Sequence, residues 1–226
     1  MKEKRKRLGM LPHIFPAVLF LGIAFSLSSP AVAEEKPTLA ILPLFVEKGG
    51  EPDRAAVCPI CRGAYRKGEI EAGGPVVLKR LLYPKMESLN LFQITPVEKV
   101  DEILSPGKRQ EMEQKPLSAS LRLGEEMTVA FVLVGFVYRF EERVGSSLGV
   151  EKPASVGFDL HLLRLRDGKA VWEGRFNETQ QPLSENLLRI KAFFRRKASW
   201  LTAEELAAVG VDEMLSRFPG LKEIEK

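Results

Sequence analysis

Short apolar runs bounded by turn residues predict several β-strands. Three of them are residues 38–46, 92–96 and 129–138. The third is the most apolar segment after residue 33, so we expect a central strand covered on both faces. From Val156 to Leu162, apolar residues alternate with polar or small ones, which predicts a strand with one solvent-exposed face. Asp167-Gly168 then predicts a hairpin turn.

Apolar residues with helical spacing lie between these strands and predict helices at 75–90, 97–104 and 117–127. Strand-helix units followed by two neighbouring strands predict an α/β fold, with a mixed sheet and helices packed on at least one face. Within the first helix, Pro84 predicts a kink or an early end.

The last part of the chain has a helical pattern only. Ser184 fits the cap of one helix, and Thr202 with Glu205 has the form of a capping box for another. We therefore expect an α/β domain over residues 34–182 and a carboxy-terminal helical segment over 183–226 that packs on it.

Residues 1–33 have the three-part layout of a secretory signal peptide. Five cations precede an apolar run from Leu8 to Ser28, and Ala31-Val32-Ala33 predicts cleavage after Ala33. An uncleaved membrane anchor is the alternative. No later stretch approaches the ~20 apolar residues of a membrane span, so we expect no transmembrane helix in the mature chain.

The charge balance changes once the signal is set aside. Residues 1–33 hold five of the 34 basic and one of the 30 acidic residues, which leaves 29 of each. The net charge of the remainder is therefore near zero. The basic character of the whole chain is thus no sign of a nucleic-acid partner, and we expect none.

The chain has two cysteines, Cys58 and Cys61, within a segment rich in glycine and proline (47–74) that predicts a long irregular loop. Three roles stay open for this pair. A local disulfide in an oxidising compartment is favoured. A zinc knuckle would also need His161 and a carboxylate, or a second chain. A redox-active dithiol would need a stabilised thiolate, but glycines stand where a thioredoxin-like helix would follow.

No other combination of residues predicts catalysis. A triad would have to use His161, whose place in an alternating strand favours a solvated or hydrogen-bonded residue. Covalent haem would need a histidine where Arg62 stands. Carboxylates near strand ends, Asp159 among them, carry no specific signal. We therefore expect no enzyme activity, no cofactor and no bound metal.

A basic and aromatic stretch near residue 190 is a candidate surface for a partner with anionic groups. Its residues are Arg189, Lys191, Phe193, Phe194, Arg195, Arg196 and Trp200. The alternative, which the pattern favours, is an amphipathic helix whose aromatic residues pack on the sheet while its cations face water.

Four segments carry a resemblance to a known family. They are 39–44 (LAILPL), 123–126 (LGEE), 131–137 (FVLVGFV) and 159–174 (DLHLLRLRDGKAVWEG). In this order they resemble bacterial envelope proteins of the curli-secretion lipoprotein family and its relatives. Those relatives include the penicillin-binding-protein activators and the amino-terminal domain of the Tol-system periplasmic protein. The resemblance covers about residues 38–176, and the lipidated cysteine of the lipoprotein members is missing.

This resemblance implies an anticodon-binding-like α/β sandwich used for protein contacts in the periplasm, without catalysis. We therefore expect a periplasmic, non-enzymatic binding or accessory module of a cell-envelope assembly. An envelope protein is the expected partner, and self-association stays open. The alternative is a thiol-disulfide or metal-binding protein centred on Cys58 and Cys61.

Overall fold

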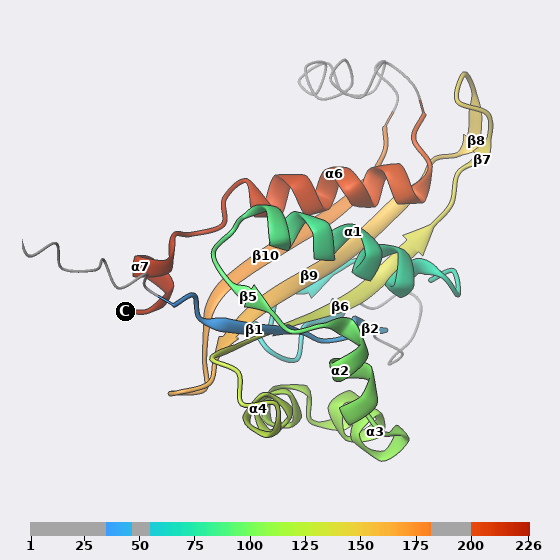
Figure 1. Ribbon diagram of the computed structural model, residues 1–226. Helices are drawn as coiled ribbons and strands as arrows, with labels where there is room; N and C mark the ends of the chain where they lie inside the picture. Colours follow the sequence, from blue (N-terminus) through green and yellow to red (C-terminus); the bar gives the residue numbers. More distant parts are fainter. Residues whose placement is uncertain (1–34, 47–54, 182–199) are drawn as a thin grey trace, which may run out of the picture. The chain divides into compact units, whose positions relative to one another are not determined.

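A six-stranded mixed sheet runs through the middle of the described chain (Figure 1). The computed structural model describes residues 35–46, 55–181 and 200–226. In spatial order the strands are β10 (Lys169–Thr179), β9 (Ser155–Arg164), β6 (Phe131–Glu141), β1 (Thr38–Ile41) and β5 (Gln93–Ile94), while β2 (Phe45–Val46) pairs with β6. β1 is parallel to β5 and β6, whereas β6, β9 and β10 are antiparallel. The predicted α/β fold with a mixed sheet is confirmed.

The first predicted strand, residues 38–46, is divided in two. β1 ends at Ile41 and β2 begins at Phe45, and both pair in parallel with β6. Pro43 lies between them and has no N–H group to donate to a strand ladder. The N–H of Leu42 still donates to the carbonyl of Leu133 at 2.9 Å, so the interruption is short.

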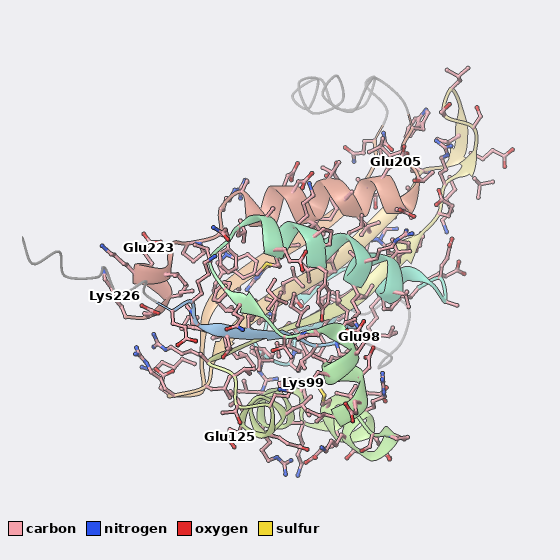
Figure 2. All side chains as sticks on the ribbon, viewed as in Figure 1. Glu98, Lys99, Glu125, Glu205, Glu223 and Lys226 are labelled. Carbon is pink, nitrogen blue, oxygen red and sulfur yellow. The ribbon has the colours of Figure 1, made fainter. Side chains whose placement is uncertain are left out.

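Helices cover both faces of the sheet (Figure 1). On one face lie α1 (Gly74–Ser88) and α6 (Ala203–Leu215), and on the other lie α2 (Val97–Ile103), α3 (Pro106–Gln114) and α4 (Pro116–Glu126). Each face has its own apolar core. Charged side chains such as Glu125 and Glu205 lie on the outer sides of these helices (Figure 2). α1 runs through Pro84 instead of ending there.

β9 is buried along its whole length, so the prediction of a solvent-exposed face is wrong. Phe158 and Leu160 belong to the apolar core under α1 and α6. Asp159 and His161 alternate with them and therefore lie on the opposite face, which is also covered. The polar positions of this strand thus indicate a buried polar site.

The described part of the predicted loop is folded against the sheet. β3 (Ala56–Val57) and β4 (Ala64–Tyr65) form a short antiparallel hairpin, which we call the cysteine hairpin. Residues 68–71 then run beside β6 through backbone hydrogen bonds. The buried guanidinium of Arg139 donates from Nη1 to the carbonyl of Arg66 at 2.7 Å. These contacts hold the hairpin over one face of the sheet.

The carboxy-terminal part begins at the predicted capping box. The hydroxyl of Thr202 accepts the N–H of Glu205 at 3.1 Å, and the carboxylate of Glu205 accepts the N–H of Thr202 at 2.8 Å, which confirms the prediction. α6 and the short α7 (Leu221–Ile224) belong to the same compact unit as the sheet.

A second hairpin, β7 (Val144–Gly145) and β8 (Val150–Lys152), extends beyond the end of β6. The helix predicted from Ser184 lies outside the described residues. Among the described helices, none combines the length and the apolar character needed to cross a membrane.

Candidate functional site

Cys58 and Cys61 lie in the turn of the cysteine hairpin. The turn is closed by hydrogen bonds from the N–H of Cys58 to the carbonyl of Gly63 (2.8 Å) and from the N–H of Arg62 to the carbonyl of Cys58 (3.0 Å). Arg62 has a φ of +62°, in the left-handed region, and this reverses the chain directly after the second cysteine. The turn therefore brings both sulfur atoms close to one point.

Backbone N–H groups point at both sulfur atoms. Those of Ile60 and Cys61 lie 3.4 Å from Sγ of Cys58, and that of Gly63 lies 3.4 Å from Sγ of Cys61. N–H groups that donate to sulfur stabilise the charged thiolate over the neutral thiol. The turn thus offers N–H donors to both sulfur atoms, and these donors favour the charged form of each.

β9 supplies the other two members of the cluster, Asp159 and His161. Being two residues apart on a strand, they share one face. Nε2 of His161 lies 3.3 Å from Oδ2 of Asp159 and 3.2 Å from Sγ of Cys58. The ligand-type atoms of Cys58, Cys61, Asp159 and His161 all lie within 4.8 Å of one another.

The cluster is shielded from solvent. Cys58, Asp159 and His161 are each 0% exposed, and Cys61 is half-buried. Burial, followed by the charge of Asp159, raises the pKa of Cys58 to about 12. Burial thus outweighs the N–H donors of the turn, and without a bound cation Cys58 is a neutral thiol near pH 7 and a poor nucleophile.

Two tyrosines form one wall of the cluster. The rings of Tyr65 and Tyr138 stack with their centroids 4.0 Å apart and their planes 8° from parallel. Oη of Tyr138 donates to Oδ2 of Asp159 at 2.8 Å, which orients that carboxylate. Burial and the charge of Asp159 raise the pKa of Tyr138 well above its usual range, so its hydroxyl stays a donor.

One cation from β10 approaches the turn. The guanidinium of Arg175 lies beside Gly63, where an added Cβ would come within 2.9 Å of it. Arg175 also pairs with Glu173 at 3.1 Å. A side chain at position 63 would therefore push the guanidinium of Arg175 away from the turn.

The structure changes the sequence-based view of the cysteines. Both are free thiols, and the favoured disulfide is not formed. Of the two roles expected for His161, solvated or hydrogen-bonded, the structure has the hydrogen-bonded one, in a fully buried position. The zinc alternative named His161 and an unspecified carboxylate, and these are the partners that lie beside Cys58. The sequence reasoning missed Asp159, although its position two residues before the one histidine outside residues 1–33 could have identified it.

Most of the predicted basic and aromatic surface falls in a part of the chain that the structure does not describe. Arg189, Lys191, Phe193, Phe194, Arg195 and Arg196 lie outside the described residues. Trp200 is described: its backbone N–H donates to the carbonyl of Ser147 at 3.0 Å, and its backbone carbonyl accepts a hydrogen bond from the guanidinium of Arg143. Trp200 therefore lies against the β7–β8 hairpin, and a partner-binding role for this stretch stays a prediction.

The chain matches no family model and no curated protein. Solved structures similar to it include the PelC dodecamer from Paraburkholderia phytofirmans, at 12% identity and a TM-score of 0.43, covering 83% of this chain and 89% of that one. Lipoprotein GNA1162 from Neisseria meningitidis is 16% identical, with a TM-score of 0.38, and covers 72% of this chain and 98% of that one.

The LpoB C-terminal domain from Salmonella enterica is 11% identical, with a TM-score of 0.37, and covers 65% of this chain and 84% of that one. LpoB is a penicillin-binding-protein activator lipoprotein, so envelope lipoproteins of the kind that the sequence resembles are among these structures. With TM-scores below 0.5 and identities of 11–16%, these likenesses carry no conclusion about the role of this chain.

Proposed function

We propose that the chain is an exported, non-enzymatic accessory module that binds a protein partner in the periplasm. The observation that carries the non-enzymatic part is the complete burial of Cys58, Asp159 and His161. A catalytic group must come within hydrogen-bonding reach of its substrate. Side chains with no exposed surface cannot do so without a large rearrangement.

The same burial weighs against a thiol-disulfide enzyme, which was one of the alternatives. The attacking cysteine of such an enzyme is exposed enough to meet another thiol and has a lowered pKa. Cys58 is buried, with its sulfur against His161. The signal-type sequence at residues 1–33 and the resemblance to envelope proteins support export and an accessory role.

Two surfaces are candidates for the partner: the long loop of residues 47–74, and the basic and aromatic stretch that ends at Trp200. The described part of the first is packed on the sheet, which favours the second. The β7–β8 hairpin lies next to Trp200, and Leu148 at its tip is 93% exposed. An apolar side chain held in solvent at the end of a hairpin is available to a partner protein.

The proposal is tested in the native host with the full chain. Intact mass of the periplasmic fraction is expected to give a chain that begins at Glu34. A photo-crosslinking amino acid at Leu148 is expected to yield one defined adduct with an envelope protein, whereas the same amino acid at Val76, which is 69% exposed on α1, gives none. A chain retained in the cytoplasm, equal adducts at both positions, or a substrate turned over by the purified chain contradicts the proposal.

A further inference from the structure

We propose that Cys58, Cys61, Asp159 and His161 bind one structural Zn²⁺ ion, which fastens the cysteine hairpin to β9. This assignment goes beyond the accessory role above and does not depend on it. It rests on four observations: the donor set, the spacing of the donor atoms, the backbone groups around the sulfurs, and the charge that the site buries.

The donor set and its spacing fit tetrahedral zinc. Zinc bound by sulfur at ~2.3 Å and by nitrogen or oxygen at ~2.0–2.1 Å places its ligand atoms roughly 3.3–3.8 Å apart. Nε2 of His161 lies 3.2 Å from Sγ of Cys58 and 3.3 Å from Oδ2 of Asp159. All four ligand atoms lie within 4.8 Å of one another, so small side-chain rotations complete the tetrahedron.

The surroundings of the donors have the character of an outer ligand shell. The three N–H groups of the turn donate to the two sulfurs, and Oη of Tyr138 donates to the carboxylate of Asp159. Such partners orient metal ligands and favour their charged forms. A disulfide carries no charge and has little need of three N–H donors.

The charge balance points to a divalent cation. Asp159 is fully buried, and among the described residues its one ion-pair partner is the ring of His161, which is charged only when protonated. Three buried polar atoms at the cluster have no hydrogen-bond partner among the described residues: Oδ1 of Asp159, Nδ1 of His161 and Oη of Tyr65. Buried groups of this kind call for an ion or water, and of the three only the Asp159 carboxylate would bind the metal itself. As ligands, the two thiolates and the Asp159 carboxylate would carry three negative charges. Zn²⁺ would neutralise two of them, and the guanidinium of Arg175 lies beside the turn that holds the sulfurs.

The identity of the metal follows from the ligands. Calcium and magnesium prefer six or more oxygen donors, whereas this site offers two sulfurs, one nitrogen and one oxygen. Four protein ligands fill a tetrahedron and leave no position for substrate, which is the pattern of a structural zinc site. The site is therefore compatible with the absence of catalysis proposed above.

The ion would have a clear mechanical role. The cysteine hairpin has two residues in each strand, and an isolated hairpin of that size is not stable in water. Cys58 and His161 are 103 residues apart in sequence. A metal that joins them closes a long loop and keeps the hairpin over the Tyr138 face of the sheet.

The first test is metal analysis of the mature chain purified from the periplasm without added chelator. We expect one zinc ion per chain by elemental analysis and two thiols that resist alkylation until the protein is unfolded with chelator. Replacement by Co²⁺ should give the visible absorption of tetrahedral cobalt together with thiolate-to-cobalt charge transfer in the near ultraviolet. These measurements use the native sequence and need no variant to fold.

Variants then assign the ligands. Cys61→Ser should lower Co²⁺ affinity at least tenfold and weaken the charge-transfer band, and Asp159→Asn should also lower the affinity. Asp101→Asn is the matched control, because this carboxylate is half-exposed on α2, pairs with Lys79 at 3.4 Å and is not one of the four residues of the cluster. It should bind cobalt as the native chain does.

Three outcomes would overturn the proposal. A metal-free chain lighter by two hydrogens would mean a disulfide. A metal-free chain with two freely alkylated thiols would mean a hydrogen-bonded cluster only. Cobalt binding that survives Cys61→Ser unchanged would place the metal elsewhere. Each leaves the accessory-module proposal intact, just as a failed crosslink at Leu148 would leave the zinc site intact.

Discussion

Replacing Tyr138 by Phe removes a single hydroxyl from the wall of the cluster and leaves the ring stack with Tyr65 in place. Oη of Tyr138 donates to Oδ2 of Asp159 at 2.8 Å, and both residues are almost fully buried. A hydrogen bond to a charged group contributes ~1.5–3 kcal/mol to stability, and its loss leaves a buried carboxylate with one partner fewer. We expect the free energy of unfolding to fall by that amount.

Tyr83→Phe is the matched control. Oη of Tyr83 donates to the carbonyl of Ile41 at 3.3 Å, a longer bond to a neutral group. Such a bond contributes ~0.5–1.5 kcal/mol. With a urea dependence of ~1–3 kcal/mol/M, the Tyr138→Phe midpoint should lie below the control midpoint by about 0.5–1 M.

Zinc affinity is the second readout, because a merely structural hydroxyl would not alter it. Loss of an outer-shell partner lowers metal affinity by ~10–100-fold, and chelator competition measures that change. If Tyr138→Phe unfolds at the same urea concentration as Tyr83→Phe and binds zinc as tightly as the native chain, the coupling of Tyr138 to Asp159 is refuted.

Two further predictions concern parts of the fold away from the cluster. Arg164 holds the pKa of Asp167 down to about 2 from 3.8 by a hydrogen bond at 2.7 Å, so the ion pair stabilises the native state above about pH 4 and is lost as the pH falls toward 2. Urea unfolding should therefore show Asp167→Asn less stable than the native chain at pH 6 and a smaller difference at pH 3; an equal difference at both values would contradict this. Gly210→Ala should lower stability by about 1–3 kcal/mol, because the new Cβ would lie 2.6 Å from the ring of Phe176, whereas Gly107→Ala meets nothing within 4 Å and should be neutral or stabilising. Thermal unfolding of the two variants checks this, and equal midpoints would argue against close packing of α6 on β10.

Local signals in the sequence were enough to predict the elements whose chemistry is local. The capping box at Thr202 forms as predicted, and so does the turn at Asp167-Gly168, where Gly168 has a φ of +68°. Both depend on side chains and backbone groups within a few residues of each other. Helical spacing likewise located α1, α2 and α4 to within a few residues.

The exposure of β9 could not be predicted in this way. Alternation separates the two faces of a strand, but it does not say what covers each face. Here the face with Asp159 and His161 is covered by a hairpin about 100 residues earlier in the chain. The alternating pattern therefore identified the polar face of β9 correctly, but the inference that solvent covers this face was wrong.

In the candidate site, too, local sequence signals predicted some features, and long-range packing decided the others. The sequence by itself determined that Cys58 and Cys61 share a turn, because a spacing of three residues keeps two side chains close in any compact turn. It also identified His161 as the one histidine that could join them. Only the tertiary structure brought β9 under the cysteine hairpin and selected Asp159 from many carboxylates, because that choice depends on strand pairing and packing between distant segments.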